Sequence, residues 1–181
     1  MACCGQVMKE KHPYQTFVGD SVQVDALRKV LIVVNPTSGN RWSLIVAKEV
    51  QEALKTVRLA VPDIAIDLRE TQYAGHAQHI TAGTNMAGYD ALLSIGGDGT
   101  AHEVVNGMLL GVVLGVHPPH ALPALCIVPC GSGNTVAYSI GYQTHEEAVQ
   151  RLLARTTRAL DVVELAHAPP TPQAGAEWLA A

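Results

Sequence analysis

The chain has 181 residues, of which 48% are apolar and 15% charged, and this is enough for one folded domain with a buried core. A net charge of −4 and few aromatic residues provide neither the basic surface nor the stacking side chains of a nucleic-acid-binding protein. The longest apolar run, 108–116, is far shorter than the roughly 20 residues of a membrane span, so any membrane contact is expected to be peripheral.

The first 28 residues show no clear periodicity and are interpreted as a leader or an edge element. They lack both the apolar core of a signal peptide and the glycine needed for myristoylation, whereas palmitoylation of Cys3 or Cys4 stays open. Cys126 and Cys130 form no CxxC pair and are expected to be small core or loop thiols in a reducing cytosol. We therefore expect a cytoplasmic protein, with peripheral membrane contact as an open option.

Alternating apolar runs and helical patterns follow from residue 29 onward. The apolar runs predict strands at 30–34, 64–68, 91–95, 124–128 and 160–165. Helices are predicted at 46–57, at a segment ending near 84, and at 104–110, 135–140 and 144–154. Strands that alternate with helices predict a parallel α/β sheet with helices on both faces, in three layers. Residues 166–181 form an Ala/Pro-rich tail without a core pattern.

Two capping boxes are predicted at helix starts, one from Thr100 to Glu103 and one from Thr144 to Glu147. Four unusual loops, at 35–39, 71–77, 96–100 and 131–134, each follow a predicted strand and precede a helix. In a parallel sheet with helices on both faces, such loops all lie at the edge where ligands bind. We therefore expect the four loops to converge on one cleft.

The loop at 96–100 holds three glycines around one acid, Asp98. Glycine-rich backbone and the start of a helix both present free N–H groups, which suit a phosphate, although a tight strand-to-helix turn is an equally simple explanation. An acid inside an anion-binding loop is unfavourable unless it takes a proton, holds a magnesium ion or orients a donor. Asp98 therefore favours phosphoryl chemistry at this loop.

Several other site types do not fit. Neither a P-loop nor a dinucleotide-binding G-x-G-x-x-G pattern occurs, since Val136 stands where a third glycine would fall after Gly131 and Gly133. The zinc-protease motif H-E-x-x-H fails because its last position is Asn106. A hydrolase of the G-x-S-x-G type is disfavoured because Cys130 replaces the outer glycine.

The loops together carry four motifs that resemble, in the same order, those of the diacylglycerol kinase and sphingosine kinase catalytic domain. These motifs are Asn35-Pro36-x-Ser38-Gly39, Thr71-x-x-x-Gly75-His76-Ala77, Gly96-Gly97-Asp98-Gly99-Thr100 and Pro129-x-Gly131-Ser132-Gly133-Asn134. The segment His102-Glu103-Val104-Val105-Asn106-Gly107 resembles sphingosine (long-chain base) kinases in particular, whereas Thr100 matches the diacylglycerol kinase form of the loop. NAD kinase shares the glycine–aspartate loop but does not predict the second and fourth motifs together.

The resemblance implies a nucleotide-binding domain that uses ATP and Mg²⁺ to phosphorylate a lipid hydroxyl, on sphingosine or another long-chain base, or otherwise on diacylglycerol. It implies that Asp98 is the proton acceptor. The ATP-binding residues that it implies are Asn35, Pro36, Thr37, Thr71, Gly75, Gly96, Gly97, Gly99, Thr100, Glu103, Ser132, Gly133 and Asn134. Two of these have structural alternatives, because Glu103 fits a capping box and Asn134 fits a helix cap.

The resemblance extends over about 29–165, which we take as the domain. Members of the family continue into a second, β-rich domain that supplies much of the lipid pocket, and residues 159–165 resemble its first strand before the chain leaves the pattern. Two functions therefore remain open. The chain is either the ATP-binding half of a lipid kinase or a truncated, catalytically idle ATP-binding or interaction module.

Overall fold

The structure is a computed structural model that describes residues 27–57, 64–118, 122–155, 157 and 162–163. Four strands and five helices are formed by these residues. In chain order they are β1 (Lys29–Val34), α1 (Trp42–Val57), β2 (Ala65–Glu70), α2 (His76–Gly83), β3 (Ala91–Gly96), α3 (Asp98–Val113), β4 (Ala124–Pro129), α4 (Thr135–Ser139) and α5 (His145–Leu153).

The strands form one parallel sheet in the order β2-β1-β3-β4. In the register of the sheet, Val34 at the end of β1 pairs with Glu70 of β2 and Ile95 of β3. Gly96, the last residue of β3, pairs with Pro129 of β4. The carboxyl ends of all four strands are therefore level with one another at one edge of the sheet.

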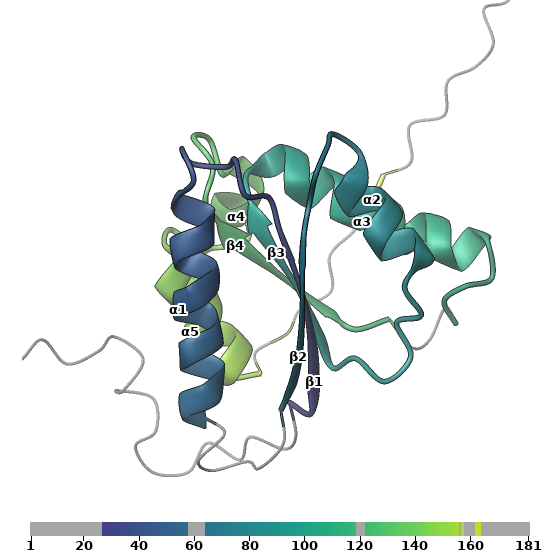
Figure 1. Cartoon of the computed structure of the whole chain (residues 1–181), viewed down its shortest axis with the longest axis horizontal. Coiled ribbons are helices and arrows are strands. Elements are labelled where there is room, and N and C mark those ends of the chain that lie inside the picture. The colour runs from purple at the N-terminus through teal and green to yellow at the C-terminus, as the bar shows by residue number, and fades with distance from the viewer. Residues whose placement is uncertain (1–26, 58–63, 119–121, 156, 158–161, 164–181) are drawn as a thin grey trace, which may run out of the picture.

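Helices cover both faces of this sheet. Alternate residues of β1, including Val30 and Ile32, point to one face and pack in a core with α1 and α5. The residues between them, Leu31 and Val33, point to the opposite face and pack with α2 and α3. Figure 1 shows α1 and α5 on one side of the strands and α2 and α3 on the other. This arrangement confirms the predicted three-layer α/β class.

The start of α3 differs from the sequence prediction. The helix begins at Asp98, six residues before the apolar periodicity that predicted it, so most of the expected glycine loop is the first helical turn. The predicted Thr100–Glu103 capping box is wrong, because the N-cap is Gly97 and no side chain caps it. Side chains of this first turn bind distant parts of the chain, Asp98 the Thr135 N–H and Thr100 the Asn35 amide, and a local sequence pattern does not reveal such contacts.

The second capping box is borne out in part. The Thr144 hydroxyl accepts a hydrogen bond from the Glu147 N–H at 3.2 Å, as predicted, whereas the Glu147 carboxylate accepts from Gln143 rather than from the N-cap residue. The strand expected at 160–165 lies mostly outside the described residues, and Val162 and Val163 are not in a strand. Cys3, Cys4 and the tail at 166–181 also lie outside the described residues.

Close packing of α2 on α3 positions the second loop. The Thr81 hydroxyl of α2 donates to Ala77 at 2.8 Å and also lies 3.3 Å from the Val104 carbonyl of α3. Gly107 faces this hydroxyl, and a Cβ there would collide with Thr81 and with the Gln78 carbonyl. The small residue lets the two helices approach closely, and this brings the start of α2 against the start of α3.

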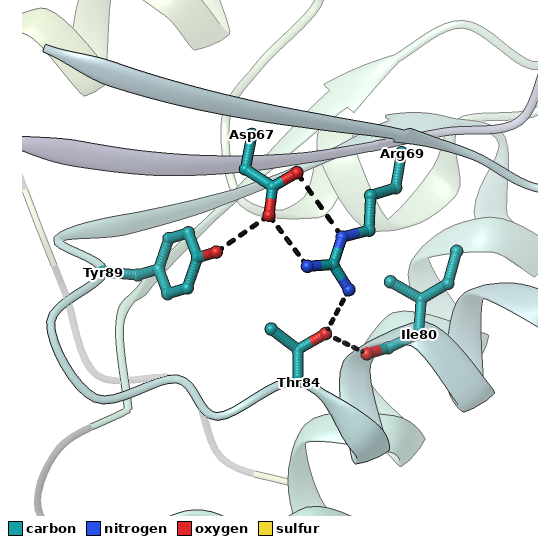
Figure 2. Close-up of polar contacts among 5 residues, drawn as sticks. All are labelled: Asp67, Arg69, Ile80, Thr84 and Tyr89. Atoms are coloured by element: carbon teal, nitrogen blue, oxygen red, sulfur yellow. Dashed lines mark hydrogen bonds and ion pairs between the residues drawn. The ribbon is translucent and has the colours of Figure 1, made fainter.

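A polar network fixes the outer strand β2 to the connection between α2 and β3 (Figure 2). The Asp67 carboxylate accepts hydrogen bonds from Arg69 at 2.8 Å and from the Tyr89 hydroxyl at 2.9 Å. Arg69 also donates to the Thr84 hydroxyl at 2.8 Å, and that hydroxyl donates to the Ile80 carbonyl at 2.6 Å. The hydrogen bond from Arg69 lowers the pKa of Asp67, and the hydrogen bond to Asp67 raises the pKa of Arg69.

We expect the network to make stability depend on pH. Because the folded-state pKa of Asp67 is below its usual value of 3.8, the carboxylate stabilises the fold above about pH 4 and loses this effect as the pH falls through the folded-state pKa. Asp67→Asn should therefore lower Tm at pH 7, and its difference from wild type should shrink toward pH 2.5. Circular dichroism melts across this range measure the effect.

Glu52→Gln is the control for this experiment. Glu52 pairs with Lys55 on the exposed face of α1 at 2.7 Å, where removal of one partner is expected to shift Tm little. A difference between Asp67→Asn and wild type that stays constant from pH 7 to pH 2.5 would contradict the role of the ionised carboxylate.

Candidate functional site

The four loops meet at the carboxyl edge of the sheet, as the parallel topology predicts. The Asn35 amide of the first loop donates to the Thr100 hydroxyl of α3 at 3.2 Å. Gly39, also in the first loop, lies so close to the Cys130 carbonyl that a Cβ on it would collide with that oxygen. The backbone N–H of Gly75, in the second loop, donates to a side chain of α3. One continuous site therefore contains residues from all four motifs.

The third and fourth loops are in direct backbone contact. A Cβ built on Gly131 would lie 2.5 Å from the Cα of Gly97 and 3.3 Å from its nitrogen. Real Cβ atoms do not approach backbone atoms so closely, so position 131 depends on the missing side chain. A Cβ on Gly97 would lie 3.2 Å from the Gly131 Cα, which is tight but not excluded. The contact holds the loop after β4 against the start of α3. Gly131 is in the motif but not among the predicted binding residues, and the Gly-Ser-Gly pattern is the signal for it.

Asp98 lies in the first turn of α3 and faces the N-terminus of α4. Its two carboxylate oxygens accept backbone hydrogen bonds from Thr135 at 3.0 Å and from Val136 at 2.9 Å. The bond from Val136, followed by that from Thr135, lowers the pKa of Asp98 below its usual value. The carboxylate is therefore ionised at neutral pH and fixed in orientation. The two hydrogen bonds also hold the start of α4 against the first turn of α3.

Glu103 lies on α3 but caps α2. Its carboxylate accepts from the N–H of Gly75 at 2.8 Å and from the N–H of Ala77 at 3.2 Å. Gly75 is the N-cap of α2 and has a φ of 86°, in the left-handed region that favours glycine. Glu103 thus satisfies free N–H groups of a neighbouring helix, and this contact anchors the second loop to α3.

The first loop is organised by the Asn35 side chain. Its amide oxygen accepts from the backbone N–H of Thr37 at 3.1 Å and from the Thr37 hydroxyl at 2.8 Å. The loop then continues through Gly39, Asn40 and Arg41, whose φ angles of 57°, 53° and 70° are all left-handed. Two successive non-glycine residues in this region are unusual, and no sequence pattern predicts them. Arg41 is exposed and brings a positive charge to this edge.

The Asn134 side chain closes the fourth loop and does not cap α4. Its oxygen accepts from the Gly131 N–H at 2.7 Å, and its amide nitrogen donates to the Gly131 carbonyl at 2.8 Å. Asn134 occupies the N-cap position of α4 with a φ of 53°, without a side-chain capping bond. The Asp98 carboxylate supplies the capping oxygens instead.

The predicted binding residues differ in how far they reach solvent. Thr71, Gly96 and Thr100 are buried, so they position the site rather than line its surface. The exposed and half-buried members are Asn35, Pro36, Thr37, Gly75, Gly97, Gly99, Glu103, Ser132, Gly133 and Asn134. Because the first N–H groups of an α-helix have no partner within the helix, the start of α3 presents donors at the centre of this group. The first turn of α3 therefore brings helix-start N–H groups and one fixed carboxylate, Asp98, together at this edge of the sheet.

The described residues form no metal cage. No group of three His, Cys, Asp or Glu side chains in the described part of the chain is arranged to hold an ion. Cys130, beside the site, and Cys126 are buried free thiols, and burial raises the pKa of each to about 12. Both thiols are therefore protonated at neutral pH, as expected of core cysteines.

An apolar cavity of about 430 Å³ lies beside α3 and the outer strand β4. Its walls include Val105 and Leu109 of α3, Ile127 of β4 and Ile140 after α4. Asp98 and Val105 are seven residues apart, so they lie on one face of α3.

In the described ranges no helix has the length and apolar character needed to cross a bilayer.

Comparisons with known proteins agree with the four motifs. Sphingosine kinase B of Dictyostelium discoideum is 35% identical over 135 residues, which make up 75% of this chain and 17% of that protein. Sphingosine kinase 1 of Homo sapiens is 31% identical over 123 residues, 67% of this chain and 30% of that protein. A crystal structure of a diacylglycerol kinase from Bacillus anthracis str. Sterne superposes with a TM-score of 0.52 at 25% identity, over 71% of this chain and 43% of that one.

The chain thus spans less than half the length of each of these relatives. The family model of the diacylglycerol kinase catalytic domain matches residues 29–165, most of the chain. This protein therefore belongs to the diacylglycerol kinase catalytic domain family.

Proposed function

We propose that this chain is the ATP-binding part of a lipid kinase, which transfers the γ-phosphate of ATP to the hydroxyl of a long-chain base or, failing that, of diacylglycerol. The observation that carries the proposal is the ionised Asp98 fixed at the N-terminus of α3, where all four loops meet. Relatives named as sphingosine kinases and as diacylglycerol kinases support the reaction class.

The phosphates are proposed to lie against the start of α3. Gly97 and Gly99 leave its backbone N–H groups accessible, and the helix dipole adds positive potential there. Ser132 and Gly133 are exposed on the adjoining loop and complete the anion-binding surface. Phosphoryl transfer depends mainly on positioning and on charge stabilisation, and a site of rigid backbone donors provides both.

Asp98 is proposed to accept the proton of the attacking hydroxyl. The acceptor oxygen forms a bond to the γ-phosphorus, the bond from that phosphorus to the bridging oxygen of ADP breaks, and the proton passes to the carboxylate. Two backbone N–H groups and the Thr135 hydroxyl bind the Asp98 carboxylate, which has about four acceptor sites and so retains one for this proton. Because the pKa of Asp98 is lowered, the carboxylate is a weak base that takes the proton late, as the ester forms.

Mg²⁺ is proposed to arrive with the triphosphate, because this ion is commonly held by substrate phosphates with one or two carboxylates. Asp98 is the one predicted site residue with a carboxylate beside the start of α3, since both oxygens of Glu103 cap α2. When bound, the ion neutralises phosphate charge.

The acceptor is proposed to be a lipid with one long hydrocarbon chain. The identities of 35% and 31% to sphingosine kinases favour a long-chain base, and the apolar cavity beside α3 is within the size range of small-molecule pockets. Asp98 and the cavity are on the same helix, and residues seven apart are separated by roughly 10 Å. A hydroxyl at Asp98 and a chain in the cavity are compatible with one bound lipid.

The direct test is to incubate the chain with Mg²⁺ and γ-labelled ATP together with sphingosine or diacylglycerol. We expect label transfer to sphingosine, with less transfer to diacylglycerol. Because the chain spans 17% to 43% of the length of its relatives, binding of ATP without transfer to either lipid would instead support the idle ATP-binding module. Failure to bind ATP would reject both functions.

A further inference from the structure

One histidine and two carboxylates form a cluster between α1 and α5, which lie on the same face of the sheet (Figure 1). The cluster consists of His145 at the start of α5, its neighbour Glu146, and Glu49 of α1. His145 Nε2 is 2.9 Å from a carboxylate oxygen of Glu49 and 3.2 Å from one of Glu146. Only 12% of the His145 side chain is exposed, so the imidazole is mostly shielded from solvent.

The cluster contacts the residue at which the first loop enters α1. This residue is Trp42, whose ring meets the His145 ring edge-on, with centroids 6.2 Å apart and an interplanar angle of 80°. The Trp42 N–H donates to the Gly39 carbonyl of the first loop at 3.1 Å. Glu49 follows Trp42 on the same helix. The position of the first loop therefore depends on how the start of α1 is held.

The cluster also lies close to the beginning of the fourth loop. Burial, and then the nearby charges of Glu49 and Glu146, raise the pKa of the Cys130 thiol to about 12. The carbonyl of the same cysteine is the group against which Gly39 packs. The cluster thus lies behind the point at which the first and fourth loops touch.

The arrangement suits a protonated imidazole. Both carboxylates contact the same ring nitrogen, so their negative charges lie close together and repel each other. A neutral imidazole offers these carboxylates one N–H and no charge, whereas the protonated ring places a positive charge between them. Histidine is the side chain that ordinarily changes charge between about pH 5 and 8. The Cys130 thiol, which the carboxylates also face, stays protonated over this range.

We propose that His145 is a positioning residue of the nucleotide site and makes nucleotide binding depend on pH. When protonated, it joins Glu49 of α1 to Glu146 of α5, and this holds the start of α1, and with it the first loop, against the fourth loop. Nucleotide affinity therefore rises as the pH falls from about 8 to about 6. This inference rests on the proposed function, because it concerns regulation of the same ATP site.

The test measures ATP affinity by calorimetry at about pH 8 and about pH 6, each variant being compared with wild type at the same pH because phosphate and other histidines also titrate in this range. His145→Gln should match wild type at the higher pH and bind ATP roughly two- to fivefold more weakly at the lower pH, the effect of one half-exposed ion pair. His145→Lys is charged at both pH values, so it should bind ATP more tightly than wild type at the higher pH and equally at the lower.

Two further variants complete the test. Glu49→Gln removes the partner on α1 instead of the histidine and should weaken ATP binding at the lower pH as His145→Gln does. His79→Gln, at an exposed histidine of α2 on the opposite face of the sheet, is the matched control, and its affinity relative to wild type should be the same at both pH values. Tm of each variant shows that it is folded.

Two results would overturn the inference and leave the proposed function intact. One is ATP binding by His145→Gln that equals that of wild type at the lower pH. The other is a loss of affinity that is equal at both pH values, which would show that His145 only packs against Trp42. If the wild-type chain binds no ATP at either pH, the ATP site itself is rejected, and the role of His145 with it.

Discussion

Asp98→Asn is expected to reduce phosphate transfer to the lipid acceptor by at least about 100-fold, the usual contribution of a positioned proton acceptor, while ATP still binds. Asparagine has the same size as aspartate but carries no charge, and it cannot take the hydroxyl proton. In the structure both oxygens of Asp98 bind N–H groups of α4, at 3.0 and 2.9 Å, and the amide of asparagine offers only one oxygen. Some loss of stability should therefore accompany the loss of transfer.

Three measurements separate the two effects. Label transfer reports the chemical step, calorimetry reports ATP affinity, and Tm reports the capping of α4. Glu52→Gln, on the exposed face of α1, is the control for the removal of one negative charge. Transfer that survives in Asp98→Asn would remove the catalytic assignment. Transfer that is lost only in proportion to ATP affinity and Tm would make Asp98 a structural cap.

Gly131→Ala is expected to destabilise the protein by about 1–3 kcal/mol, the range for overpacking of a close contact. The added Cβ would lie 2.5 Å from the Gly97 Cα, and neither backbone can move away without separating the loop after β4 from α3. The nucleotide should therefore bind more weakly as well. Urea denaturation gives the change in the free energy of unfolding, and ATP titration gives the change in affinity.

Gly83→Ala is the matched substitution. Gly83 ends α2, and a Cβ there would have no heavy atom within 4 Å, so alanine is expected to be neutral or slightly stabilising. If Gly131→Ala proves as stable as Gly83→Ala and binds ATP as wild type does, the backbone contact between the two loops is not needed to assemble the site.

The sequence predicted the layers and the edge of the sheet at which the four loops meet, because both depend on local patterns. Apolar runs such as Val30 to Val34 are typical of strands covered on both faces, and the observed sheet has helices on both faces. Parallel strands then require that every loop after a strand lies at one edge. The sequence alone therefore places together the glycine-bearing segments at 35–39, 71–77, 96–100 and 131–134.

The sequence could not predict the partners of the charged residues. Glu103, three residues after Thr100, fits a capping box on its own helix, yet it caps α2 because close packing at Gly107 brings that helix within reach. Asp98 binds N–H groups of residues 37 and 38 positions later in the chain. Hydrogen bonds of this kind depend on how helices pack, which periodicity does not encode.

The sequence by itself determined the fold class, the order of the four motifs and the edge of the sheet at which they meet. Only the tertiary structure decided that α3 begins at Asp98, that Gly131 rests on Gly97, and that Glu103 caps α2. The physical reason is the distance along the chain over which each effect acts. Hydrophobic alternation and turn chemistry act over a few residues, whereas capping by a neighbouring helix and close backbone contact depend on how distant elements pack.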